Sequence, residues 1–288
     1  MIPPAFDYAV PGTLNEAVAL LRKNPEARVL AGGHSLIPMM RFRLASPAVL
    51  VDINRLEGLA YIREADGWLK IGALTREAEL DQSMLVRQKY PLLADTARVI
   101  ADPLVRNRAT IGGNLAHADP ANDHPATMLA YGAQIVAAGP KAERVIPVDQ
   151  FFTGPFQTAL AHDEILTEIR IPAQKSGSGG AYLKIERKVG DFATVAVAVQ
   201  VTLGKNGNCE YVGLGLTNVA LTPIRAAKAE AALKGQKPDD ANIKKAAQLA
   251  AEAAEPTDDY RGSADYKRAL VKTLTVRALR KAVERAKA

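Results

Sequence analysis

The sequence contains one cysteine, few aromatic residues and no long apolar run. Cys209 alone cannot form an intramolecular disulfide, and an iron–sulfur cluster needs about four thiolate ligands. Redox chemistry would therefore depend on a bound organic cofactor or on a partner chain. Cys209 fits the pattern of a small apolar residue on a strand, and the alternative is a reactive thiol. Aromatic residues make up 5% of the chain, so we expect an aliphatic core.

No stretch of about 18 apolar residues is present, which excludes a transmembrane helix. The opening residues, Met1-Ile2-Pro3-Pro4, lack the basic and apolar regions of a secretory signal. We therefore expect a cytoplasmic protein. Hydrophobic residues at 48% and charged residues at 24% are typical of a globular chain, and 288 residues are enough for two or three domains.

The formal net charge is +6, and much of the positive charge lies close to the C-terminus. No helix-turn-helix, zinc module or aromatic stacking platform accompanies it, so nucleic acid is not a predicted partner. The basic cluster is interpreted as a solvated helix face or as a docking face for an acidic partner subunit. Its members are Arg277, Arg280, Lys281, Arg285 and Lys287.

The hydrophobic pattern divides the chain into three units. Residues 1–56 alternate short strands and helices, which predicts a small α/β unit with parallel strands. Residues 57–177 begin with a hairpin pattern and separate helices from strands, which predicts an α+β unit with an antiparallel sheet. A flexible linker at 175–180 leads to residues 178–288, where we expect another antiparallel sheet and a helical cluster. The whole chain is assigned to the α+β class.

Two glycine pairs with polar neighbours are the first candidate binding segments. They lie in AGGHS at 31–35 and in TIGGN at 110–114. Backbone without Cβ atoms can approach a ligand closely, and consecutive main-chain amides form concave anion sites. Ser35, Thr110 and Asn114 add side-chain donors, so the expected ligand is a pyrophosphate. Neither segment has the spacing of a Rossmann fingerprint or of a P-loop.

A segment rich in histidine and aspartate follows the second glycine pair. His117 and His124 are not at helical spacing, and Pro120 and Pro125 indicate an irregular loop, so a metal site is the weaker interpretation. The favoured interpretation is that Asp123 accepts hydrogen bonds from a sugar or ribityl hydroxyl beside the phosphate turn. No metal ligand is therefore assigned.

Six segments together carry a resemblance to a known family. They are IPPAFDY at the start, AGGHSLIPMM at 31–40, IADPLVRNRATIGGNLAHADPANDHPA at 100–126, KIERKVGDFATVAVAV at 184–199, LGLTNVALTP at 214–223 and RGSADYKRAL at 261–270. They resemble the FAD-binding medium subunits of aerobic carbon monoxide dehydrogenases, which are related to the FAD domain of xanthine dehydrogenase. The resemblance covers essentially the whole chain.

The resemblance implies that FAD lies between the first two units, with its diphosphate in both glycine turns and its isoalloxazine ring toward the third unit. Asp123 corresponds to a carboxylate on the hydroxylated chain of the flavin, and Leu166 to a backbone contact at the isoalloxazine edge. Lys184 corresponds to a residue on the pyrimidine side of the ring. The implied cofactor-binding residues are Ala31, Gly32, Gly33, His34, Ser35, Leu36, Thr110, Ile111, Gly112, Gly113, Asn114, Asp123, Leu166, Lys184 and Phe192.

Phe192 departs from the family pattern, which commonly has a tyrosine beside the ring. A phenyl ring can shield or stack on the flavin but offers no hydroxyl, and the alternative is an ordinary core phenylalanine. His34 is assigned through its backbone, with its imidazole packed in an interface. No residue is assigned a catalytic role.

In this family the substrate is oxidised at a molybdenum cofactor in a large subunit. Electrons then pass through two [2Fe–2S] clusters of a small subunit to the FAD of the medium subunit. The resemblance thus implies an oxidoreductase subunit within a dimer of heterotrimers. A free-standing FAD-dependent oxidoreductase and a non-catalytic nucleotide-binding or scaffold protein are the alternatives. The substrate stays open, because such complexes oxidise carbon monoxide, aldehydes, heterocycles or purines.

Overall fold

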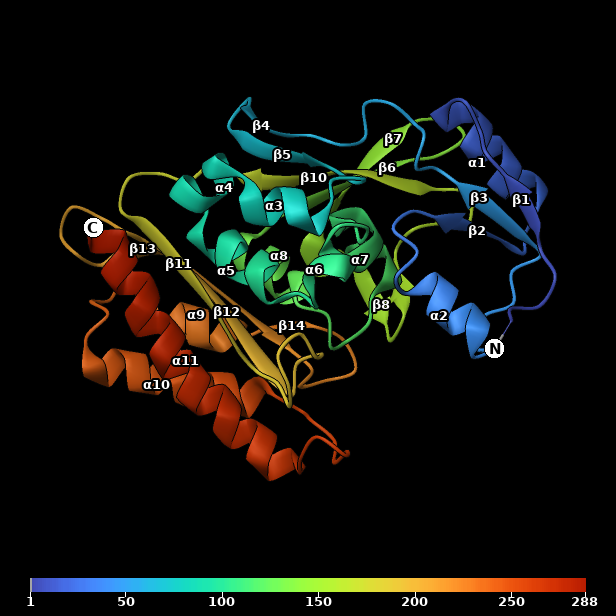
Figure 1. Cartoon of the computed structure of the whole chain (residues 1–288). Helices are drawn as coiled ribbons and strands as arrows, with labels where there is room; N and C mark the ends of the chain where they lie inside the picture. Colours follow the sequence, from blue (N-terminus) through green and yellow to red (C-terminus); the bar gives the residue numbers. More distant parts are fainter. Residues whose placement is uncertain (1) are drawn as a thin grey trace.

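The computed structural model describes residues 2–288, and its three larger sheets follow one another along the chain (Figure 1). The N-terminal sheet lies on the right of the view, the middle sheet at the top and the C-terminal sheet at the lower left. This mixture of segregated sheets and helices confirms the predicted α+β class. The boundaries at residues 56 and 177 stay predictions. Among residues 2–288, every helix is too short or too polar to cross a membrane.

The N-terminal sheet is parallel, as the alternation of strands and helices predicted. Its strand order is β1-β3-β2, and α1 packs against two of its strands. Thr13 caps α1 by accepting a hydrogen bond from the Glu16 amide at 3.2 Å. The elements are β1 (Asp7–Ala9), α1 (Leu14–Lys23), β2 (Ala27–Leu30), α2 (Leu36–Arg41) and β3 (Val49–Asp52).

The middle unit is an antiparallel sheet of five strands in the order β4-β5-β10-β6-β7. Its first hairpin turns at Asp66 and Gly67, whose φ angles of 54° and 79° suit the two-residue turn that the sequence predicted. The elements are β4 (Ile62–Ala65), β5 (Trp68–Gly72), α3 (Glu77–Gln82), α4 (Met84–Lys89), α5 (Pro91–Val99), α6 (Pro103–Arg106), α7 (Ile111–His117), α8 (His124–Tyr131), β6 (Gln134–Ala138), β7 (Glu143–Pro147), η1 (Val148–Gln150), the hairpin β8 (Phe152–Gly154) and β9 (Gln157–Thr158), and β10 (Ile165–Pro172).

The C-terminal sheet is antiparallel and is covered on both faces. The long helix α11 packs against β11 and β12, and α8 of the middle unit packs against β12 and β13. Glycines make the second contact possible: a Cβ atom on Gly213 or Gly215 would lie about 2 Å from a carbonyl oxygen of α8. The elements are β11 (Ser178–Ile185), β12 (Val195–Leu203), β13 (Cys209–Thr217), β14 (Ile224–Arg225), α9 (Ala227–Leu233), α10 (Asp240–Ala253) and α11 (Ala264–Lys287).

The flexible linker predicted at 175–180 is wrong in its second half. Gly179 and Gly180 belong to β11, and a Cβ atom on Gly179 would lie 2.2 Å from the Ala282 carbonyl oxygen of α11. These glycines therefore serve close packing of a helix on a strand. Cys209 is fully buried on β13, which confirms the interpretation as a small core residue, and burial raises the pKa of its thiol to about 11.

The basic residues of α11 are partly engaged within the chain. Lys281 and Arg285 bind the Asp95 carboxylate of α5 at 2.9 and 2.7 Å, and Arg285 also donates to the Gly180 carbonyl. Arg280 pairs with Asp240 at 2.7 Å. The sequence predicted a solvated or docking face, but three of its five cations fasten α11 to the rest of the protein.

Candidate functional site

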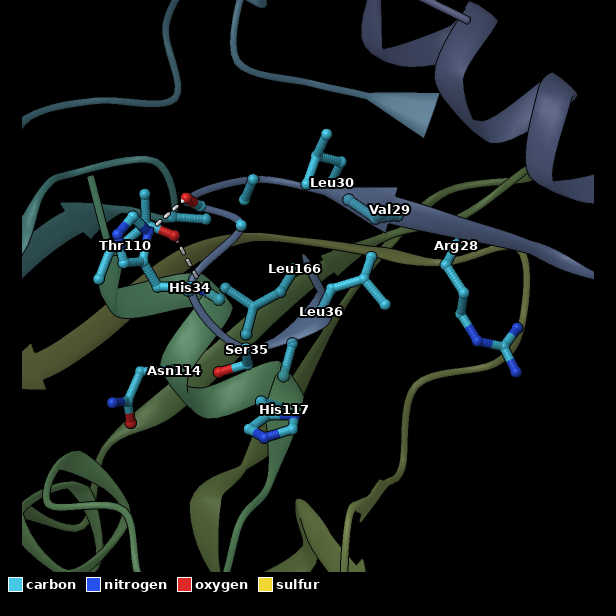
Figure 2. A pocket seen from close by; sticks show the side chains of 18 of the residues that line it. Arg28, Val29, Leu30, His34, Ser35, Leu36, Thr110, Asn114, His117 and Leu166 are labelled. Carbon is cyan, nitrogen blue, oxygen red and sulfur yellow. Dashed lines mark hydrogen bonds between the residues drawn. The ribbon is translucent and has the colours of Figure 1, made fainter. Parts of the chain in front are cut away.

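A cavity of about 740 Å³ is lined mainly by the N-terminal and middle units, a volume in the range of small-molecule sites. Both glycine turns line it. Figure 2 shows the side chains of Ser35, Leu36, Thr110, Asn114 and Leu166 around this space. The cavity therefore lies where the sequence placed a dinucleotide.

The two glycine segments are in direct contact, although they are far apart in the sequence. A Cβ atom on Gly32 would lie 2.5 Å from the Arg108 carbonyl oxygen and 2.8 Å from the Ala109 Cα. Because both neighbours are backbone atoms, neither can move aside easily. Only glycine fits at position 32. Because the two segments pack closely here, they form one continuous wall of the cavity.

The first turn presents a row of available main-chain donors. Within the described part of the chain, the amides of residues 32–36 donate no hydrogen bond to any protein acceptor. All five residues line the cavity. Their amides are free because they precede or begin α2, whose first hydrogen bond runs from the Ile37 amide to the Gly33 carbonyl. Consecutive free amides of this kind form a concave site for an anion.

The second turn differs from the first, although the sequence predicted the same role for both. Its amides are already used: Ile111 donates to the Thr75 carbonyl at 3.1 Å and Gly112 to the Ala73 carbonyl at 3.0 Å. The Gly113 amide donates to Thr110 Oγ1 at 3.2 Å, as an N-cap bond of α7. The backbone of 110–114 thus anchors α7 to the neighbouring strand region and offers few donors to a ligand.

The side chain of Asn114 supplies what the second turn's backbone does not. It lines the cavity, and its Oδ1 atom is buried without a hydrogen-bond partner among the described residues. A buried polar atom without a partner is costly, so a ligand donor in the cavity would stabilise it. The His34 ring, which was expected to pack in an interface, is exposed, and its Nδ1–H donates to the Gly32 carbonyl at 2.9 Å.

Asp123 lines the cavity but is held by the protein itself. Its carboxylate accepts a hydrogen bond from the Tyr182 hydroxyl at 2.6 Å and lies 3.2 Å from the Lys184 ammonium. Burial raises the pKa of the Asp123 carboxyl, and both partners oppose that shift. One oxygen of Asp123 retains a lone pair for a ligand hydroxyl, so the predicted role is compatible with this arrangement.

Lys184 lies behind the cavity wall, whereas the resemblance placed it beside the flavin. Its ammonium lies within hydrogen-bond distance of the Val99 and Asp191 carbonyl oxygens at 2.8 and 3.0 Å, and near Asp123 and Glu186. An ammonium has three hydrogens, and the hydrogen bonds to Val99, Asp123 and Asp191 use them all. Lys184 therefore stabilises the residues behind the cavity wall. Its contact with the isoalloxazine ring stays a prediction.

The C-terminal unit reaches the cavity through a single loop between β11 and β12. The lining residues from this loop are Gly190, Asp191 and Phe192. Phe192 is 44% exposed, which excludes the alternative of an ordinary core phenylalanine. Gly190 (φ 80°) packs against Ala101, whose carbonyl oxygen would lie 2.8 Å from a Cβ atom on the glycine.

Thirteen of the fifteen predicted cofactor-binding residues line the cavity, and the exceptions are Ile111 and Lys184. Ile111 is fully buried in the core of the middle unit, because its side chain points away from the turn that its backbone forms. Whether the thirteen bind FAD stays a prediction. The sequence analysis missed Ile100, Ala101, Gly190 and Asp191, although the quoted motifs at 100–126 and 184–199 contain them.

A second group of missed residues lies on the hairpin of β8 and β9. Phe156 lines the cavity with a φ of 57°, and its ring centroid lies 5.2 Å from that of His117. The Gly154-Pro155 dipeptide is typical of a turn, and nothing in this part of the sequence indicates a ligand. His117 and His124 end α7 and begin α8, and no metal-binding group of three His, Cys, Asp or Glu residues occurs in residues 2–288.

Comparisons with known proteins match two domain families along the chain. Residues 4–174 match the FAD binding domain in molybdopterin dehydrogenase, and residues 180–282 match the CO dehydrogenase flavoprotein C-terminal domain. The carbon monoxide dehydrogenase medium chain of Hydrogenophaga pseudoflava is 47% identical over 97% of both chains. The 6-hydroxypseudooxynicotine dehydrogenase complex subunit alpha of Paenarthrobacter nicotinovorans is 38% identical, over 100% of this chain and 97% of that one.

The structural comparison leads to the same group of proteins. A solved carbon monoxide dehydrogenase from Hydrogenophaga pseudoflava, which lacks the Mo-pyranopterin moiety of the molybdenum cofactor, superimposes with a TM-score of 0.96. The match covers 99% of each chain at 47% identity. Sequence and fold thus agree over the full length of the chain with the resemblance stated from the motifs. The chain belongs to the family of FAD-binding medium subunits of molybdenum hydroxylases of the carbon monoxide dehydrogenase type.

Proposed function

We propose that this chain holds one FAD non-covalently and works as the electron-transfer subunit of a molybdenum hydroxylase. It would receive electrons from two [2Fe–2S] clusters of a small partner subunit, which take them from a molybdenum cofactor in a large partner subunit. It would pass them to an external acceptor such as a quinone or oxygen. The flavin supplies the one-electron chemistry, and the chain supplies its position and surroundings.

The observation that carries the proposal is the row of five free amides at 32–36. It lies in a cavity of suitable size, against the segment that contains Asn114 and its buried, unpartnered oxygen. A diphosphate matches the amides, because its oxygens are acceptors and its charge is negative. A hydroxylated chain matches the polar groups beyond them.

Each part of the cavity then has a task. The 32–36 turn binds the diphosphate, and Asp123 accepts a hydrogen bond from the hydroxylated chain. Leu166 of β10 and the half-exposed Phe192 of the C-terminal unit would supply apolar contacts that exclude water from the ring. None of these residues moves a proton, and none is assigned to substrate oxidation.

The chain itself cannot hold the clusters of the proposed pathway. Its one cysteine, Cys209, is fully buried on β13. We therefore propose a heteromer, with a dimer of heterotrimers as the assembly and the cytoplasm as its location, where free thiols stay reduced. We assign substrate oxidation to the large partner. The two relatives above are subunits of dehydrogenases named for chemically different substrates, carbon monoxide and 6-hydroxypseudooxynicotine.

Purification from the native source tests the heteromer. We expect the chain to elute with two further subunits, with iron and molybdenum in the complex, and to release about one FAD per chain on denaturation. The isolated chain should not oxidise the substrate of the complex. A lone chain that turns over its own substrate without iron or molybdenum would instead establish a free-standing flavoenzyme.

A charge substitution tests the diphosphate site. Asn114→Asp keeps the size of the side chain but adds a negative charge to the cavity that holds the proposed diphosphate, and like charges brought together cost several kcal/mol. We expect the FAD dissociation constant to rise at least about tenfold, measured by fluorescence titration. Asn15→Asp, on an exposed position of α1, is the matched control. Equal affinities for the two variants would place the diphosphate elsewhere.

A further inference from the structure

The loop at 187–192 is the route by which the C-terminal unit touches the cavity. The lining residues that follow Leu166 in the sequence all belong to this loop, and they are Gly190, Asp191 and Phe192. The loop connects β11 to β12 and packs against Ala101, another residue that lines the cavity. The position of this loop therefore determines which atoms of the C-terminal unit can contact a ligand in the cavity.

Arg261 holds this loop from outside. Its guanidinium lies 3.2 Å from each carboxylate oxygen of Asp191 and donates to the Phe192 carbonyl oxygen at 2.9 Å. The arginine side chain is only 8% exposed, so water competes little for these bonds. Arg187 adds a contact to Asp191 at 3.1 Å, and together with the bond from Arg261 it lowers the pKa of the Asp191 carboxyl to about 2.

Arg261 is in turn fixed by a short turn ahead of α11. Its amide donates to Asp259 Oδ1 at 2.8 Å, and the other carboxylate oxygen binds the Lys267 ammonium at 2.7 Å. Lys267 is 2% exposed at its side chain and also donates to the Thr257 carbonyl at 3.0 Å. The Tyr260 ring lies beside the guanidiniums of Arg187 and Arg261, at 4.6 and 5.0 Å.

We propose that Arg261 is a positioning residue for the flavin, which acts by clamping the loop at 187–192 across the end of the cavity. The RGSADYKRAL segment, which the sequence analysis left without a task, then supplies both the clamp and its anchor, Lys267. The fork of the guanidinium spans Asp191 and the Phe192 carbonyl together, which a single point charge cannot do. The inference rests on the proposed FAD site.

The test compares Arg261→Gln, Arg261→Lys and the control Arg277→Gln in the full chain. Arg277 is exposed on α11 and makes no hydrogen bond or ion pair among the described residues. Trypsin cleavage after the exposed Lys188 in FAD-free protein reports on the loop alone. The FAD dissociation constant and the absorbance band shape of the bound flavin report on the ring, and circular dichroism confirms that each variant is folded.

For Arg261→Gln we expect cleavage after Lys188 to become about tenfold faster and FAD binding to weaken by a similar factor. Arg261→Lys should recover part of both effects, because it keeps the charge but loses the fork. Arg277→Gln should match the wild type. If Arg261→Gln does not fold, Arg261→Lys still tests the proposal. The proposal is overturned if this variant equals the wild type in cleavage rate, FAD affinity and flavin band shape. If the wild-type chain does not bind FAD, the proposed FAD site is refuted. The cleavage rates would still show whether Arg261 holds the loop.

Discussion

The buried pair of Glu77 and His124 gives a direct test of how the cavity wall is supported. Both side chains are 0% exposed, and His124 Nε2 lies 2.7 Å from Glu77 Oε2. Glu77 begins α3 and its amide donates to the Ala109 carbonyl at 3.0 Å, while His124 follows Asp123 in the sequence. The hydrogen bond between Glu77 and His124 thus links residues next to two cavity-lining positions, Ala109 and Asp123.

The remaining atoms of the pair, Glu77 Oε1 and His124 Nδ1, have no partner among the described residues. His124→Leu therefore leaves the fully buried Glu77 side chain without its hydrogen-bond partner, which costs about 1–3 kcal/mol. For a chain of this size, 1 kcal/mol changes the melting temperature by roughly 2 °C, so we expect a decrease of about 2–6 °C. Glu77→Leu should lower it by a similar amount.

The double variant Glu77→Leu/His124→Leu separates the pair from simple loss of packing. Replacing both partners of a buried hydrogen-bonded pair by apolar residues of similar shape can be nearly neutral, so the double variant should be more stable than either single one. Thermal and urea unfolding of the four proteins give the coupling free energy. Additive losses, with the double variant the least stable, would refute the pair as a coupled support.

Two further predictions concern the turn and the loop. Gly33→Ala should lower the free energy of unfolding by about 1–2 kcal/mol, because φ at this position is 79°. It should also weaken FAD binding about tenfold, because it would move the free amides. Gly67→Ala, with the same φ and open space around it, is the control and should show the loss of stability alone. The Asp191 carboxyl has a lowered pKa of about 2, so it stabilises the fold above its usual value of 3.8 and loses this effect as the pH falls toward 2. The difference in urea stability between the wild type and Arg261→Gln should accordingly shrink between pH 4 and pH 2, and a constant difference would contradict it.

The local patterns of the chain predicted much of the fold, because strands and turns follow from short-range features. The hairpin at Asp66 and Gly67 and the parallel N-terminal sheet are examples. The linker at 175–180 failed for a long-range reason. Glycine is needed at Gly179 because α11, about a hundred residues later, packs its backbone there, and composition alone does not distinguish this from flexibility.

The site was predicted at the level of segments rather than of atoms. The two glycine pairs look alike in the sequence, yet the amides of Ile111 and Gly112 are used by the Thr75 and Ala73 carbonyl oxygens. No pattern within 110–114 reveals those acceptors, since they lie on a segment that the tertiary fold brings near. The same holds for Lys184, whose ammonium is satisfied by oxygens from three separate segments.

The motifs at 184–199 and 261–270 looked like independent signatures within the third unit, and only the first contained residues expected beside the ring. The structure joins them, because Arg261 from the second motif binds Asp191 and the Phe192 carbonyl from the first. A replacement in the C-terminal motif should therefore alter the flavin end of the cavity without touching the diphosphate turn. If the proposed FAD site holds, the free amides at 32–36 and the clamped loop at 187–192 would contact one ligand, and its affinity would depend on both.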